Sequence, residues 1–217
     1  MGKPTDFKAV AAQLAKPEGE AGIETAEHMN VSNGEMTRYA IDLMAYQPDA
    51  QVLEIGPGNG NFASYLLSKG QDVLYTGVDW SETMVKEARK INEYHINAGR
   101  MRFELTDGQT FPFPSQSFDN IFTVNTLYFW DNPGIQLAEI RRMLKPSGTF
   151  CLAIASRSFM EQLPFTAYGF KLYTPEVAQE LLLTNGFSEV DTTIRNHKII
   201  GAYRQEMMRE EVFIHAR

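Results

Sequence analysis

The sequence predicts an α/β protein with a doubly wound, mostly parallel sheet, helices on both faces of that sheet and an antiparallel hairpin at the C-terminus. Short apolar runs alternate with segments of helical periodicity over 49–155, which is typical of parallel strands joined by crossover helices. The first of these runs ends in a glycine-rich turn, as in α/β sheets that bind nucleotides. The tail, 187–217, alternates in places at period two, which is typical of hairpin strands.

The N-terminal part is expected to be helical. Helix-forming residues fill 5–16, and the proline and glycines that follow predict a loop over 17–27. Apolar residues then recur at three- and four-residue spacing over 29–44. This spacing predicts a second helix, with Ser32 or Asn33 as its N-cap.

The body of the chain is expected to hold five strands and three helices. Apolar runs bounded by glycine, aspartate or turn residues mark the strands, and apolar residues on one face mark the helices. In chain order we expect a strand over 51–55, a helix over 61–69, a strand over 72–79, a helix over 81–92, strands over 101–105 and 118–125, a helix over 135–144, a turn over 145–148 and a strand over 149–155. An irregular, aromatic-rich segment follows over 156–173, then a helix over 175–185 and two or three strands in the tail.

Composition narrows the class of protein. The chain has 217 residues, 43% of them hydrophobic and 22% charged, which fits one soluble globular domain. Its single cysteine, Cys151, excludes an intramolecular disulfide and a cysteine-based zinc site. The net charge of −7 disfavours attraction to nucleic acid or to anionic membranes. Since no apolar run approaches the roughly 18 residues of a membrane span and the N-terminus has no apolar signal core, we expect a cytoplasmic protein.

The glycine turn after the first expected strand indicates the kind of ligand. Gly56, Gly58 and Gly60 follow a Gly-x-Gly-x-Gly pattern, whereas a dinucleotide loop requires Gly-x-Gly-x-x-Gly. Glu54 stands two residues before the first glycine, where its carboxylate would repel a pyrophosphate but attract an ammonium group. The turn therefore points to an amino-acid-bearing nucleotide, and a nicotinamide oxidoreductase is disfavoured.

Three residues near the end of the second expected strand fit a nucleoside. Asp79 is placed to accept hydrogen bonds from the two hydroxyls of a ribose. The alternative role for this residue is a helix N-cap, for which Ser81 competes. Trp80 and Met84 would cover an adenine ring, although ordinary packing between a sheet and a helix explains both of them as well.

The stretch from Val52 to Gly60 resembles the first motif of the class I S-adenosylmethionine-dependent methyltransferases. The resemblance covers nearly the whole chain from about residue 30 and is strongest over 51–155. It implies a Rossmann-like sheet of seven strands, S-adenosyl-L-methionine as the cofactor and a ribose-binding role for Asp79. The residues that it places beside the cofactor in the first motif are Glu54, Gly56, Pro57, Gly58 and Gly60.

Two later positions also carry the resemblance. In the family an aspartate at the place of Asp107 accepts a hydrogen bond from the adenine amino group, and the next N–H, here that of Gly108, donates to the ring. An Asp-Gly pair is also common in plain turns. Asn125 would lie over the cofactor, and a loop asparagine with internal partners is an equally good interpretation. DNA amino-methyltransferases have two prolines after this asparagine, and this chain has Thr126 and Leu127 instead, so that chemistry is not expected.

The implied reaction is in-line transfer of a sulfonium methyl group, in which the protein aligns donor and acceptor and excludes water. No catalytic base is assigned by the motifs. His28 is the best candidate by position, and a surface histidine is the alternative. The resemblance implies that helices in 1–48 cap the active site of a domain over 49–217, with 156–173 as a lid over the acceptor. No carboxylate cluster follows the fourth or fifth strand, so no metal is expected.

The aromatic residues of that lid favour a small, apolar acceptor, as in the type 11 branch of the family, which includes enzymes of ubiquinone and menaquinone biosynthesis. Two other functions remain open on the same scaffold. One is methylation of nucleic acid or protein, and the negative net charge disfavours nucleic acid as the substrate. The other is a module that binds S-adenosylmethionine without catalysis. The sequence leaves the oligomeric state open.

Overall fold

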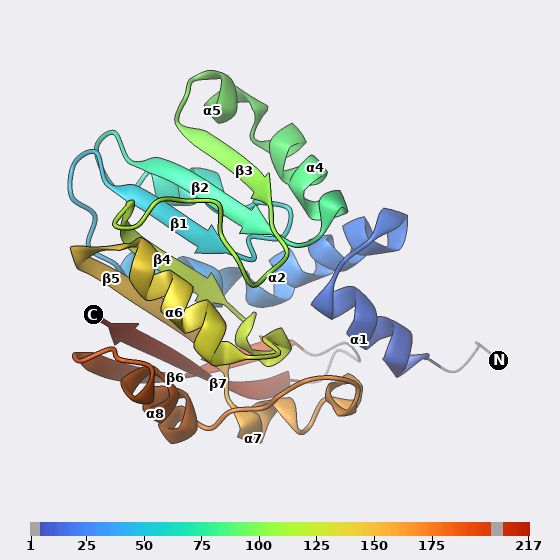
Figure 1. Cartoon of the computed structure of the whole chain (residues 1–217). Helices are drawn as coiled ribbons and strands as arrows, with labels where there is room; N and C mark the ends of the chain where they lie inside the picture. Colours follow the sequence, from blue (N-terminus) through green and yellow to red (C-terminus); the bar gives the residue numbers. More distant parts are fainter. Residues whose placement is uncertain (1–4, 201–205) are drawn as a thin grey trace.

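The computed structural model describes residues 5–200 and 206–217 and contains one seven-stranded sheet (Figure 1). The strand order is β3-β2-β1-β4-β5-β7-β6. The strands are β1 (Gln51–Ile55), β2 (Leu74–Asp79), β3 (Met101–Leu105), β4 (Phe118–Val124), β5 (Leu144–Ala155), β6 (Val190–Ile200) and β7 (Glu206–Ala216). All neighbours are parallel except for β5 with β7 and β7 with β6, which are antiparallel. The predicted α/β, mostly parallel sheet with antiparallel C-terminal strands is therefore confirmed.

Helices cover both faces of the sheet. They are α1 (Phe7–Ala15), α2 (Gly19–Leu43), α3 (Ala63–Leu67), α4 (Glu82–Ile91), α5 (Glu93–Asn97), α6 (Pro133–Met143), α7 (Arg157–Met160) and α8 (Pro175–Thr184), with 3-10 turns η1 (Leu127–Phe129) and η2 (Pro164–Ala167). In Figure 1, α6 and α8 lie in front of the sheet and α2 passes behind it. None of the helices in the described part of the chain is both long and apolar enough to cross a membrane.

The core is built from alternate residues of the same strands. On β4, Ile121 belongs to the apolar cluster under α6 and α8, whereas Phe122 belongs to the cluster under α2, α3 and α4. On β7, Ile214 belongs to the first of these clusters and Phe213 to the second. Because successive side chains of a strand point to opposite faces, two covered faces require apolar residues at consecutive positions. This explains why the central strands read as continuous apolar runs.

The functional end of the sheet is set by topology. β1 lies between β2 and β4, so the crossovers that leave its two sides run in opposite directions. A crevice forms at such a switch point, outside the carboxyl ends of the strands. Figure 1 shows the arrowheads of β1, β2 and β4 directed toward α1 and the N-terminal half of α2.

The helix predicted over 29–44 begins ten residues earlier than expected, at Gly19, so the prediction of a loop over 17–27 was wrong. α2 begins at Gly19, and Ser32 and Asn33 lie inside it rather than at its cap. A Cβ added at Gly22 would lie 2.6 Å from the carbonyl carbon of Pro17. The glycine therefore allows a close approach between the chain before the helix and its first turn, and it does not break the helix.

Three other segments differ from the expectations. The turn expected over 145–148 is part of β5, and the pairing with β4 shifts register between Phe118 and Asn120 to absorb the irregular residues. The segment 156–173 contains α7 and η2, and α5 was not expected. The bounds of the other predicted elements up to residue 185 agree with the structure to within two residues, the usual uncertainty of helix and strand ends.

Candidate cofactor and acceptor site

The turn after β1 can be formed only by glycine at its key positions. Gly56 and Gly60 have φ values of 75° and 67°, in the left-handed region. A Cβ added at Gly56 would lie 2.5 Å from Cγ2 of Thr126, and one added at Gly60 would lie 2.8 Å from the ring of Phe103. The backbone of the turn therefore packs closely against β3 and the loop after β4, and it leaves its outer side free for a ligand.

A pocket lies over this turn, at the carboxyl ends of β1, β2 and β4. Its walls also include the turn after β3, the start of α6, the end of α1 and one face of α2. Nine of the residues predicted to bind the cofactor line it. They are Glu54, Gly56, Pro57, Gly58, Asp79, Trp80, Asp107, Gly108 and Asn125. Gly60, Met84 and His28 are not part of its lining.

Glu54 is a buried carboxylate at the floor of the pocket, 5% exposed. Oη of Tyr75 donates a hydrogen bond to its Oε2 at 2.6 Å. Burial raises the pKa of Glu54 to about 7, although the Tyr75 hydrogen bond partly offsets that effect. No cationic side chain among the described residues pairs with this carboxylate, so a cation from a ligand would supply the missing partner.

Asp79 fixes the glycine turn from β2. Its carboxylate accepts hydrogen bonds from the N–H groups of Gly58 at 3.0 Å and of Ser81 at 2.9 Å. Burial raises its pKa to about 6 in spite of these two bonds. The N-cap of α4 is Ser81, whose Oγ accepts from the N–H of Met84, so Asp79 does not cap the helix. Each carboxylate oxygen of Asp79 retains capacity for a further donor.

The side of the pocket expected to hold adenine contains one residue that sequence reasoning missed. Trp80 is held by a hydrogen bond from its Nε1 to the carbonyl of Ala15, whereas Met84 is fully buried outside the pocket. Gln136 of α6 lines the pocket, and its Nε2 donates to the carbonyl of Gly108 at 3.0 Å. Its Oε1 is buried and has no hydrogen-bond partner in the described part of the chain. The packing of α6 against the sheet brings Gln136 to the wall of the pocket, and no local sequence motif indicates this position.

Asp107 forms a local turn in the free protein. Its exposed carboxylate accepts from the N–H groups of Thr110 and Gln109, and these bonds lower its pKa. The N–H of Gly108 donates to Oγ1 of Thr106. A ligand at this position would have to share or replace these contacts.

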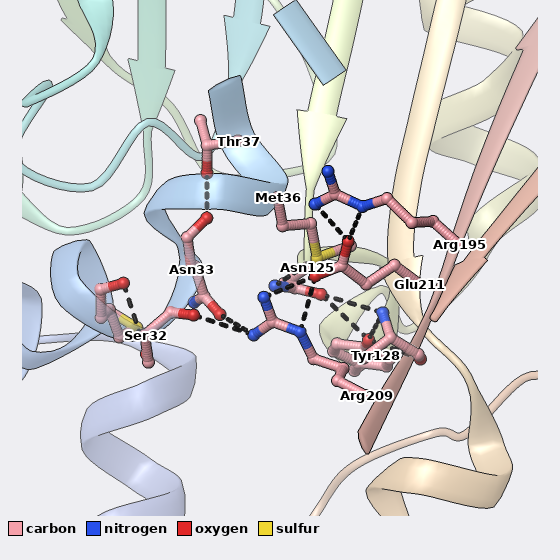
Figure 2. Close-up of polar contacts among 11 residues, drawn as sticks. Ser32, Asn33, Met36, Thr37, Asn125, Tyr128, Arg195, Arg209 and Glu211 are labelled. Atoms are coloured by element: carbon pink, nitrogen blue, oxygen red, sulfur yellow. Dashed lines mark hydrogen bonds and ion pairs between the residues drawn. The ribbon is translucent and has the colours of Figure 1, made fainter. Parts of the chain in front are cut away.

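Asn125 has a fixed orientation at the end of β4. Its φ of 58° is in the left-handed region, which asparagine tolerates better than most residues. Its Oδ1 accepts hydrogen bonds from the N–H of Ala155 at 3.2 Å and from Oη of Tyr128 at 3.1 Å. Its Nδ2 is 3.6 Å from Sδ of Met36 on α2 (Figure 2). The amide therefore turns its donor end toward α2 and the pocket.

One face of α2 forms the opposite wall. The residues of that face that line the pocket are Ala26, Met29, Asn30, Asn33 and Thr37. His28 is exposed and lies off this face, so the structure gives it no contact with the site. The sequence assigned the cap to 1–48 but no single residue of this face to the site, because the sequence alone does not show which face of the helix meets the pocket.

The segment 156–173 contributes no residue to the lining of the pocket. It supports the loop after β4 instead, because Nζ of Lys171 donates to the carbonyls of Trp130 and Asp131. No cluster of three or more residues suited to hold a metal ion occurs within 5–200 or 206–217.

Comparison with known proteins identifies the family. Residues 53–152 match the family model described as a methyltransferase domain. Over 122 residues the chain is 33% identical to the fatty-acid O-methyltransferase of Mycolicibacterium smegmatis, an alignment that covers 54% of this chain and 43% of that protein. Residues 53–152 therefore form a methyltransferase domain, as the resemblance to the class I S-adenosylmethionine-dependent enzymes implies.

Two further likenesses agree with this assignment. An O-methyltransferase of Pyrenophora dematioidea is 24% identical over 185 residues, with 79% of this chain and 67% of that protein covered. A chain of the solved complex between the Haloferax volcanii Trm112 methyltransferase activator and a methyltransferase shares the fold with a TM-score of 0.75 and 19% identity, covering 99% of this chain and 98% of that one. The alignment with the mycolicibacterial relative spans 43% of that protein, less than half of its length.

The residues present in the methyltransferase fit its family's cofactor, S-adenosylmethionine. The methionine part of that molecule carries an ammonium group, and Glu54 is a buried carboxylate without a cationic partner among the described residues. A Cβ added at Gly58 would meet no atom within 4 Å, so the glycine turn leaves open space on its outer side, and Asp79 offers acceptors to a ribose. The charge of Glu54 and the shape of the glycine turn therefore both suit this ligand.

We expect the affinity of the methyltransferase for S-adenosylhomocysteine to fall as the pH is lowered from about 8 to about 5.5. The pKa of Glu54 is about 7 in the free protein, so below that pH a proton must leave before the carboxylate can pair with the ammonium group. The loss reaches about tenfold per pH unit for one such group. Calorimetry across this range measures the slope, and Glu54→Gln is expected to flatten the part above the pKa of Asp79, which is about 6. An affinity of the wild-type protein that does not change with pH would contradict this assignment.

Proposed function

We propose that the protein transfers the methyl group of S-adenosylmethionine to a small-molecule acceptor by direct in-line displacement. The observation that carries the proposal is one continuous pocket. It joins the glycine turn, Glu54 and Asp79 on one side to Asn125 and the polar face of α2 on the other. Donor and acceptor bound in its two halves would face each other across the end of β4, which is the alignment that the reaction requires.

The residues of the chain bind the cofactor, orient it toward the acceptor and enclose both molecules. Glu54 pairs with the ammonium group, Asp79 accepts from the ribose, and Trp80 with the turn at Gly108 holds the adenine. The cofactor supplies the activated carbon, so a base is needed only where the acceptor must lose a proton. We propose no catalytic base, since His28 lies off the pocket. The helices within 1–48 act as a cap that excludes water, and the end of α1 and one face of α2 in the wall of the pocket support this role.

Three observations favour a small acceptor. The described residues that line the pocket include no lysine or arginine, and the chain carries a net charge of −7. Both curated relatives compared above are named as O-methyltransferases, one of them acting on fatty acids. Methylation of a nucleic acid requires a positively charged surface, and the sequence has no excess of lysine and arginine over aspartate and glutamate. For the segment 156–173, we propose a supporting role beside the acceptor site, through the loop that Lys171 holds.

Incubation with methyl-labelled S-adenosylmethionine tests the proposal. The protein is mixed with a panel of small carboxylic acids, phenols and amines and with a cell extract, and the products are identified by mass spectrometry. We expect label in a small molecule, in an amount that grows with time and enzyme. Label found only in protein or nucleic acid would contradict the small-acceptor proposal. Binding without any transfer would favour the alternative of a non-catalytic binding module.

A further inference from the structure

A buried group of charges lies behind the acceptor half of the pocket (Figure 2). It consists of Arg195 on β6 with Arg209 and Glu211 on β7, and we call it the hairpin charge cluster. Oε1 of Glu211 accepts from Nη2 of Arg209 at 2.6 Å, and its Oε2 is 2.6 Å from Nη2 of Arg195. Glu211 is fully buried and Arg209 is 3% exposed.

The charges of this cluster do not balance. Two guanidinium groups share one carboxylate, and within the described residues no second carboxylate pairs with either of them. One positive charge is therefore in excess beside two buried side chains, Arg209 and Glu211, while the Arg195 side chain is 24% exposed and lies 4.3 Å over the ring of Tyr39. Uncompensated charge in such a place is unfavourable, and a nearby anion relieves it.

Asn33 connects the cluster to the pocket. Nη1 of Arg209 donates to Oδ1 of Asn33 at 3.1 Å and to the carbonyl of Ser32 at 2.9 Å, which ties β7 to α2. A guanidinium has only donors, so the amide oxygen of Asn33 must face Arg209. Its Nδ2 keeps two N–H donors and has no partner in the described part of the chain. Asn33 lines the pocket.

Asn125 is arranged in the same way from the other side. Its oxygen lies within hydrogen-bonding distance of the N–H of Ala155 and of Oη of Tyr128, and its Nδ2 has only the weak sulfur acceptor of Met36. Figure 2 shows Asn33 and Asn125 on either side of the Arg209 guanidinium, one from α2 and the other from the end of β4. Both amides have oxygens that are already occupied and nitrogens that can still donate.

We infer that the acceptor half of the pocket recognises a carboxylate group of the acceptor molecule, through the amide N–H donors of Asn33 and Asn125 and the excess positive charge of the hairpin charge cluster. The inference rests on the proposed function and adds the chemical class of the acceptor. One excess charge and two neutral donors match a singly charged carboxylate better than a doubly charged phosphate. An ammonium group of an acceptor would face the N–H donors of Asn33 and Asn125 and the positive charge of the cluster, so an amine acceptor is disfavoured.

Three matched probes test this inference without a known substrate. The protein is first saturated with S-adenosylhomocysteine, and octanoate, octanamide and octylamine are then titrated in a calorimeter. These molecules share the chain length and differ in head-group charge. We expect octanoate to bind at least about tenfold more tightly than octanamide, and octylamine to bind more weakly than both. Octanoate that binds no better than octanamide, or a preference for octylamine, overturns the inference.

Asn33→Asp makes the test specific to the cluster. The aspartate keeps the size of the residue and its contact with Arg209, but it supplies a negative charge from within and removes the N–H donors. We expect the preference for octanoate to disappear while S-adenosylhomocysteine still binds. Asn97→Asp on exposed α5 changes the charge of the protein by the same amount and should leave the preference intact. An unchanged preference in Asn33→Asp overturns the inference, whereas failure of the wild-type protein to bind S-adenosylhomocysteine overturns the proposed function itself.

Discussion

Replacing Asp79 with alanine is expected to weaken the binding of S-adenosylhomocysteine by at least about 100-fold. The carboxylate is nearly fully buried and holds the N–H groups of Gly58 and Ser81, and we propose that it accepts from two ribose hydroxyls. Hydrogen bonds to a charged group contribute about 1.5–3 kcal/mol each, so the loss of two of them amounts to about 3–6 kcal/mol. Each 1.4 kcal/mol or so changes the affinity tenfold.

Isothermal titration calorimetry of the wild-type and variant proteins measures this change. Asp191→Ala serves as the control, because that aspartate is exposed on β6, away from the pocket. The control should bind like the wild type. A dissociation constant for Asp79→Ala within about threefold of the wild-type value would contradict the ribose-binding role, since a difference that small is under 1 kcal/mol.

Glu211→Ala is expected to lower the free energy of unfolding by about 3–5 kcal/mol, the range for breaking a buried ion pair by removal of one partner. The substitution leaves Arg209, which is nearly fully buried, and Arg195 without their shared carboxylate. It also removes the support that holds Arg209 against Ser32 and Asn33 of α2. The effect is therefore large both for the fold and for the wall of the pocket.

Denaturant unfolding measures the free energy of unfolding of Glu211→Ala and of the control variant Glu210→Ala. Glu210 is the preceding residue on β7 and points to the other face of the sheet, where Oγ of Ser158 donates to its Oε1. Its removal should change the free energy of unfolding by no more than about 0.5 kcal/mol, as for most surface substitutions. Equal stabilities of the two variants would show that the hairpin charge cluster does not stabilise this fold.

The cofactor half of the site could be predicted because its requirements are local. The Gly56 turn, Glu54 and Asp79 are fixed by short-range geometry at the ends of buried strands, and their residue types leave few other interpretations. β1 and β3 were predicted with their observed bounds because β1 is a short, mostly apolar buried run and β3 alternates buried Met101 and Phe103 with more exposed residues. Gly60 supports the turn from behind, against Phe103, rather than lining the pocket.

The acceptor half could not be predicted because it depends on contacts between distant segments. Arg209 lies 176 residues after Asn33, and two charged residues in a tail predict an exposed strand. Only the placement of β7 between β5 and β6 buries them. The misplaced start of α2 had a local cause, since Gly22 was interpreted as a loop residue although its contact with Pro17 requires glycine inside the helix. Gln136 was missed because no spacing rule links α6 to the turn after β3.

A crystal structure of the protein soaked with S-adenosylhomocysteine tests the central claim most directly. Electron density is expected in the crevice over the Gly56 turn, with the ammonium nitrogen within hydrogen-bonding distance of the Glu54 carboxylate and both ribose hydroxyls at Asp79. A crevice that stays empty at saturating ligand, or a ligand bound with its amino-acid part away from Glu54, would contradict the assignment of this turn to S-adenosylmethionine.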